Sequence, residues 1–141
     1  DKPAIIYGDG EQKRCFSYVA DCVSCLVKMA LDKEIVNEVI NIGPDEEAIT
    51  INDVAELVAK TCKYKGEPIY KDDRPLEVKF ATCSSSKARR LLDYNTSTSL
   101  QEAVKKTVDY IIEVGPKPFD YAYRIEIENE KTPTTWKDRE M

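Results

Sequence analysis

Residues 8–21 read GDGEQKRCFSYVAD, and this stretch decides how the N-terminal part of the chain is expected to fold. Two glycines separated by one residue permit the positive φ angles of a tight turn. A short apolar segment, residues 4–7, precedes the turn, and residues 15–19 read as a second short strand. We therefore predict a hairpin turn that delivers Arg14.

A second basic position occurs further along the chain, in the sequence Asp72-Asp73-Arg74-Pro75. A guanidinium offers paired donors in a planar fork, which suits phosphate oxygens better than a flexible lysine does. Arg14 and Arg74 are therefore expected to converge on one phosphorylated ligand. The net charge of −5 argues against a nucleic-acid partner, because duplex binding requires a broad basic face, so any phosphate site is local.

The bulk composition indicates one ordinary globular domain. A chain of 141 residues with 42% hydrophobic content is long enough for a core. It contains no run of about eighteen apolar residues, and its first residues resemble no signal peptide, so neither a membrane partner nor secretion is expected. We expect a cytoplasmic protein.

Five cysteines and no histidine restrict the chemistry that the chain can perform. An odd number of cysteines in a chain of this size favours reduced thiols over a disulfide framework. Cys22-x-x-Cys25 lies within a predicted helix without a second such pair, so buried structural thiols are expected and a metal site is not. The lack of histidine removes the usual general base.

Strands and helices are predicted to alternate, which indicates an α/β fold with several parallel pairings. Besides the two N-terminal strands, strands are expected over residues 39–43, 67–70 and 78–81, with the first of these buried and the second at an edge. Helices are expected over residues 20–32, after capping boxes at Thr50 and Ser99, and after the serine run 84–86, which caps a short helix. The longest helix is expected to end at Gly115-Pro116.

Six motifs in order resemble the substrate-domain signature of the nucleotide-sugar epimerase/dehydratase family, whose members are extended short-chain dehydrogenase/reductases similar to UDP-glucose 4-epimerase. They cover about residues 3–112 and are Ile6-Tyr7-Gly8-Asp9-Gly10-x-Gln12-x-Arg14-x-Phe16-x-Tyr18-Val19-x-Asp21-Cys22-Val23, Val39-Ile40-Asn41-Ile42-Gly43, Thr50-Ile51-x-Asp53-Val54-Ala55-x-Leu57, Arg74-Pro75, Ser86-Lys87-Ala88-x-x-Leu91-Leu92 and Ser99-Leu100-x-Glu102. The resemblance implies a nucleotide-sugar-binding domain over residues 1–115, followed by a partly irregular extension over 116–141.

The catalytic half of the family pattern is missing. Members carry a glycine-rich dinucleotide fingerprint and a Tyr-x-x-x-Lys pair, and neither occurs in this sequence. We therefore expect a C-terminal fragment of a longer enzyme, inactive alone, with the Rossmann domain absent and NAD bound by a missing N-terminal domain. The resemblance further implies a homodimeric full-length protein.

The resemblance also implies roles for individual residues, none of them catalytic. Arg14 and Arg74 would contact the diphosphate of a nucleotide-diphosphate sugar. Asn41 would lie at the nucleotide site, although a strand-terminal asparagine that bonds its own turn is the alternative. Asp73 would orient the neighbouring guanidinium or contact the ribose, and a loop acid without a role is equally compatible with the sequence.

Two departures from the family pattern concern the arginines. Cys15 stands where relatives often have aspartate, which removes an expected charge partner of Arg14. Leu76-Glu77 replaces a common Gly-Asp, which alters the expected loop. A function of another class also stays open, namely a stand-alone binding or interaction module without catalysis.

Overall fold

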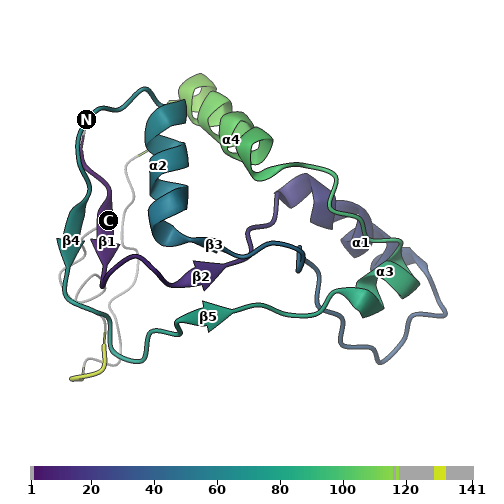
Figure 1. Ribbon diagram of the computed structural model, residues 1–141. Helices are drawn as coiled ribbons and strands as arrows, with labels where there is room; N and C mark the ends of the chain where they lie inside the picture. Colours follow the sequence, from purple (N-terminus) through teal and green to yellow (C-terminus); the bar gives the residue numbers. More distant parts are fainter. Residues whose placement is uncertain (1, 116, 118–128, 133–141) are drawn as a thin grey trace.

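The computed structural model describes residues 2–115, 117 and 129–132. Within them the elements follow one another as β1 (Ile5–Tyr7), β2 (Lys13–Arg14), α1 (Val19–Leu31), β3 (Ile49–Thr50), α2 (Ile51–Thr61), β4 (Ile69–Lys71), β5 (Phe80–Ala81), α3 (Ser86–Leu92) and α4 (Leu100–Val114). Figure 1 shows β1 and β4 at one end, α1 and α3 at the other, and α2 and α4 together between the ends. No helix among these residues is long and apolar enough to cross a membrane.

The described strands form two small sheets. In the first, β1 pairs in parallel with β4, and Ile6 lies opposite Tyr70. In the second, β2 is central, antiparallel to β3 and parallel to β5, so Arg14 lies between Ile49 and Ala81. The predicted alternation with parallel pairings is confirmed. The predicted hairpin is wrong, because β1 and β2 belong to different sheets and the glycine turn connects the sheets.

The predicted helix starts are largely confirmed. The Thr50 hydroxyl accepts a hydrogen bond from the backbone of Asp53 at 3.0 Å, and Ser99 accepts one from Glu102 at 3.3 Å, which satisfies amides at the two helix starts. The longest helix ends at Gly115 as predicted. The prediction that a serine side chain caps α3 is wrong. Ser85 occupies the cap position, but its hydroxyl donates to the carbonyl of Gly43 instead.

Two predicted strands do not form. Residues 15–18 are irregular, because β2 ends at Arg14 and α1 begins at Val19. Residues 39–43 are also outside any strand, and Val39 is 86% exposed where a buried strand was predicted. A strand requires a partner edge, and among the described residues the segment 36–44 makes no backbone-to-backbone hydrogen bond.

The core lies between α1 and α3. Cys25, Ala88, Leu92 and Tyr94 form a buried cluster, against which Met29, Ile35, Ile40, Ile42 and Leu91 pack. The expectation of buried thiols holds for Cys25 alone. Cys62 and Cys83 are exposed, because the first follows the end of α2 and the second lies in the loop before α3.

Asp21, in the first turn of α1, ties this core to the segment before α4. Its carboxylate accepts hydrogen bonds from the backbone and hydroxyl groups of Ser97 and Thr98, over 2.7 to 3.2 Å. Burial alone would raise the pKa of this carboxyl, but the hydrogen bonds outweigh it and the pKa lies below its ordinary value. The carboxylate therefore holds α4 in place while it stays ionised.

Candidate functional site

The glycine turn at residues 8–10 is the centre of the candidate site. Gly8 and Gly10 have φ angles of 72° and 73°, as the sequence predicts. A Cβ atom at Gly8 would collide with the side chain of Asp73, and one at Gly10 with that of Asn52. Asn52 also donates from its amide nitrogen to the carbonyl of Asp9 at 3.0 Å. The start of α2 and the segment before Arg74 therefore fix the turn from two sides.

Arg14 is held by a carboxylate from the Arg74 loop. Its Nη2 donates to Oε1 of Glu77 at 2.6 Å, and the two side chains are only 26% and 21% exposed. Its Nη1 donates to the carbonyl of Lys13 at 2.7 Å. Glu77 thus supplies the charge partner that the replacement of aspartate by Cys15 was expected to remove.

Arg74 is exposed, and an aromatic ring fixes it. Its guanidinium carbon lies 4.2 Å from the centre of the buried Tyr7 ring, within the range of a cation–π contact. Among the described residues Arg74 has no carboxylate within ion-pair distance. The amide of Glu77 donates to the carbonyl of Arg74 at 3.3 Å, which closes a four-residue turn. This turn therefore presents Arg74 at one end and the partner of Arg14 at the other.

Lys79 and two aspartates complete the charged surface. Lys79 lies 3.3 Å from the carboxylate of Asp73 and 3.6 Å from that of Asp9. The hydrogen bond to Asp73 raises the pKa of Lys79, and a hydrogen bond from the backbone of Glu11 lowers the pKa of Asp9. Asp73 thus contacts Gly8 and pairs with Lys79, whereas Tyr7 holds the guanidinium that Asp73 was expected to orient.

Asn41 lies outside the cluster formed by Arg14, Asp73 and Arg74. It is exposed in the segment beside α3, where Lys87 donates to the carbonyl of Val39 at 3.0 Å and Ser85 bonds Gly43. No contact described in the structure joins Asn41 to Arg14 or Arg74. The structure therefore brings together three of the four predicted site residues, Arg14, Asp73 and Arg74.

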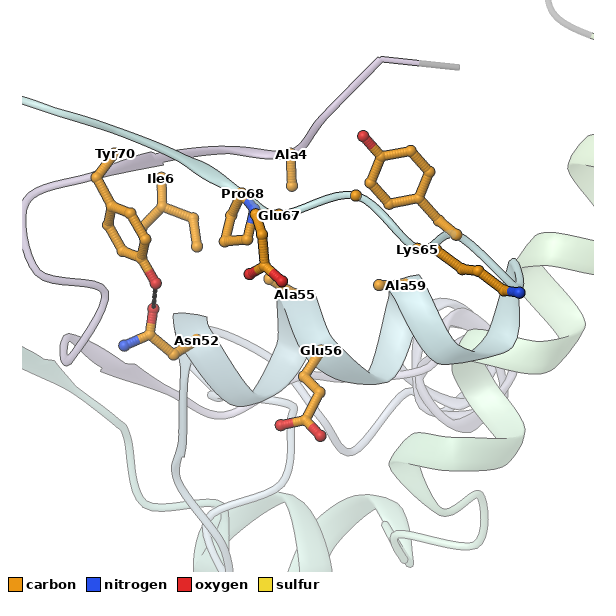
Figure 2. Close-up of a pocket in the computed structure, with 12 residues that line it drawn as sticks. Ala4, Ile6, Asn52, Ala55, Glu56, Ala59, Lys65, Glu67, Pro68 and Tyr70 are labelled. Atoms are coloured by element: carbon orange, nitrogen blue, oxygen red, sulfur yellow. Dashed lines mark hydrogen bonds between the residues drawn. The ribbon is translucent and has the colours of Figure 1, made fainter.

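A cavity of about 420 Å³ opens between the β1–β4 pair and α2. Figure 2 shows that Tyr70 of β4 reaches Asn52 of α2 across it, with Oη 3.1 Å from Oδ1. The side chains of Ala55 and Ala59 line the helix side. None of the four predicted site residues lines this cavity, so the arginine cluster and the cavity are separate features.

Sequence reasoning missed three residues that support the cluster: Tyr7, Asn52 and Glu77. Tyr7 and Gln12 belong to the first motif, and a glutamine between a turn and a strand was a usable signal. Gln12 is buried and donates to the carbonyl of Tyr7 at 3.0 Å, while its Oε1 and the Tyr7 hydroxyl have no hydrogen-bond partner among the described residues. Asn52 follows the capping Thr50, but nothing in the sequence indicates that it contacts Gly10.

Residues 1–107 match the family model described as "GDP-mannose 4,6 dehydratase". This chain belongs to that family. The resemblance to nucleotide-sugar epimerases and dehydratases of the extended short-chain dehydrogenase/reductase type is thereby confirmed. A curated relative is the UDP-glucuronate 4-epimerase of Thermodesulfobacterium geofontis (strain OPF15), 32% identical over 110 residues, which are 78% of this chain and 33% of the relative.

Solved structures of family members share the fold. The crystal structure of UDP-glucose 4-epimerase from Thermotoga maritima with UDP-glucose is 33% identical, has a TM-score of 0.72, and matches over 80% of this chain and 36% of its own. That of UDP-glucuronic acid 4-epimerase from Bacillus cereus with UDP-glucuronic acid and NAD is 34% identical, has a TM-score of 0.73, and matches over 81% and 36%. The chain spans about a third of the length of these relatives.

The glycine turn does not have the arrangement of a dinucleotide-binding loop. A dinucleotide loop needs a glycine-rich turn that leads directly into the N-terminus of a helix, where free amides meet the pyrophosphate. Here the turn at Gly8 and Gly10 leads into β2, which is paired on both sides.

Proposed function

We propose that this chain is the C-terminal, nucleotide-sugar-binding part of an NAD-dependent epimerase or dehydratase, with the binding domain over residues 1–115. The observation that carries the proposal is Arg74, an exposed guanidinium stacked on Tyr7 without a carboxylate partner among the described residues. The family membership and the UDP-sugar complexes of the solved relatives support the same ligand class.

The geometry suits a diphosphate. The Arg74 guanidinium lies over the Tyr7 ring and has no carboxylate partner among the described residues, so its donors are available for phosphate oxygens. Glu77, at the other end of the same turn, accepts a hydrogen bond from one guanidinium nitrogen of Arg14 on β2. Two arginines positioned by one turn provide paired donors on neighbouring segments, as two linked phosphates require.

The proposed contribution to catalysis is binding energy. Contacts to the diphosphate position the remote hexose. Binding contacts to non-reacting parts of a substrate lower the activation barrier of the reaction at the reacting part. The residues that take the proton and the NAD that accepts the hydride are assigned to the part of the enzyme outside this chain. Asp73 borders the same turn and is assigned to the site, whereas Asn41 would contact a more distant part of the nucleotide.

The test uses the full-length protein. Arg14→Ala and Arg74→Ala are each expected to weaken UDP-glucose binding by at least tenfold, since a charge-assisted hydrogen bond contributes about 1.5–3 kcal/mol. The bound NAD, measured from the absorbance of the released cofactor, is expected to stay at the wild-type level. Unchanged UDP-glucose affinity in both variants overturns the proposal.

A further inference from the structure

The β1–β4 pair is a sheet of only two strands among the described residues. Two strands alone are marginally stable in water, and a third strand or a packed helix is needed to stabilise them. Ile6 and Tyr70 line the cavity toward α2, as Figure 2 shows. Ile5 and Ile69 lie opposite each other on the other face and are 46% and 49% exposed. This face of the pair therefore retains apolar surface that a further strand could cover in part.

The outer edge of β4 is unpaired within the described part of the chain. The amide of Ile69 donates to the carbonyl of Ala4 at 2.8 Å, and the carbonyl of Lys71 accepts from the amide of Gly8 at 2.9 Å. In a parallel ladder alternate residues bond the same neighbour, so the N–H and C=O of Tyr70 point away from β1. Neither group is bonded to another described residue. An edge of this kind can accept a further strand.

Residues 121–128, which lie outside the described residues, have the alternating pattern of a half-buried strand. Their sequence is YAYRIEIE, in which tyrosine or isoleucine occupies every second position and the positions between them carry alanine, arginine and two glutamates. The family match ends at residue 107, so this segment belongs to an extension that the family model does not cover. The extension therefore contains a candidate strand of its own.

The described residues on both sides of this segment lie at opposite ends of β4. In Figure 1, α4 packs on α2 and ends at Val114, at the same end of the molecule as the last turn of α2, from which the chain leads into β4. Figure 1 draws residues 129–132 beyond the arrowheads of β1 and β4. An extended chain reaches about 3.3 Å per residue, so residues 118–128 are long enough to pass along β4. Their direction would be that of β4.

We propose that residues 121–127 add to the outer edge of β4 as a third, parallel strand. Their apolar side chains then lie beside Ile69, on the face that it shares with Ile5, and their backbone bonds the outward groups of Tyr70. The charges agree with this direction, because Glu126 follows the apolar residues and approaches Lys71, at the end of β4. The added strand holds the segment that leads from β4 to Arg74. The inference concerns the extension and does not rest on the proposed function.

Hydrogen exchange of the full-length protein, measured by mass spectrometry, tests the inference. About half of the amides within residues 121–127, those that face β4, are expected to exchange at least tenfold more slowly than free-chain amides. This protection is expected to be independent of protein concentration. Ending the chain after Lys117 removes the segment and is expected to accelerate exchange in β4 at least tenfold.

A chain that ends after Thr132 is the matched control, because it keeps the segment and loses only the residues that follow. Its β4 amides are expected to stay protected. The amides of α1, at the other end of the molecule in Figure 1, report whether each shortened chain folds. If the chain that ends after Lys117 does not fold, the exchange of residues 121–127 in the wild type decides.

Free exchange throughout residues 121–127 overturns the inference. Protection that disappears on dilution also overturns it, because a second copy of this chain would then pair with β4. Unchanged protection of β4 in a folded chain that ends after Lys117 is equally contrary, since another part of the enzyme would then cover the edge.

Discussion

The guanidinium of Arg14 donates to the carboxylate of Glu77 at 2.6 Å, and so links β2 to the turn that begins at Arg74. The pair is mostly shielded from solvent, so we expect it to stabilise the protein. A double-mutant cycle with Arg14→Ala and Glu77→Ala is expected to give a coupling free energy of about 1 kcal/mol in urea unfolding, decreasing in high salt. A coupling near zero at low salt would show that the pair does not hold the two segments together.

Leu76 occupies the third position of the turn with a φ angle of 63° and is 83% exposed. A side chain at positive φ costs about 1 kcal/mol, and an exposed leucine recovers little of it by burial. Leu76→Gly is therefore expected to raise the free energy of unfolding by up to about 1 kcal/mol, reduced by the greater freedom of glycine in the unfolded chain.

Val78→Gly is the matched control, because Val78 is also exposed and is not among the residues with positive φ. It is expected to destabilise the protein, and both variants are compared by thermal unfolding. If both glycines lower the melting temperature equally, the backbone of the turn does not favour glycine at position 76.

Asp45 is expected to make stability depend on pH under acid conditions. Its carboxylate accepts from Arg89 at 2.5 and 3.2 Å and from the backbone of Ser85 at 2.7 Å, and the bond to Arg89 contributes most to lowering its pKa from 3.8 to about 2. Between about pH 4 and pH 2 the unfolded chain binds the proton more readily than the folded one. The stabilisation is therefore complete above this range and is lost as the pH falls through it.

Urea unfolding between pH 2 and pH 5 checks this dependence. Asp45→Asn cannot titrate, so its stability is expected to fall less steeply with acid than that of the wild type, and Arg89→Gln is expected to reduce the steepness as well. Identical slopes in the wild type and Asp45→Asn would place the acid sensitivity elsewhere.

Several local signals in the sequence predicted the structure correctly, because a few neighbouring residues determine the outcome there. Hydroxyl caps at Thr50 and Ser99 and a positive φ at Gly8 follow from the chemistry of a few neighbouring residues, and all are present. The motifs also placed Arg14 and the Arg74 loop in one site, and the ion pair between Arg14 and Glu77 joins the two segments. That both arginines bind one ligand stays a prediction.

Most of the wrong predictions concern the pairing of strands, which a local sequence pattern does not specify. Residues 39–43 have the composition of a buried strand, but a strand forms only against a partner edge, and this segment pairs with no strand of the described residues. The partner of β1 is β4, from a segment far along the sequence, so the glycine turn does not close a hairpin. The stacking of Arg74 on Tyr7 depends on the same pairing, because it brings the end of β1 beside the segment after β4.

Isothermal titration of UDP-glucose into the protein as its gene encodes it tests the central claim most directly, with Arg74→Ala and Arg90→Ala compared side by side. Both variants lose one exposed arginine, but Arg90 lies on α3, outside the proposed site. We predict that Arg74→Ala raises the dissociation constant at least tenfold and that Arg90→Ala leaves it unchanged. Wild-type affinity in Arg74→Ala, or an equal loss in both variants, would contradict the account.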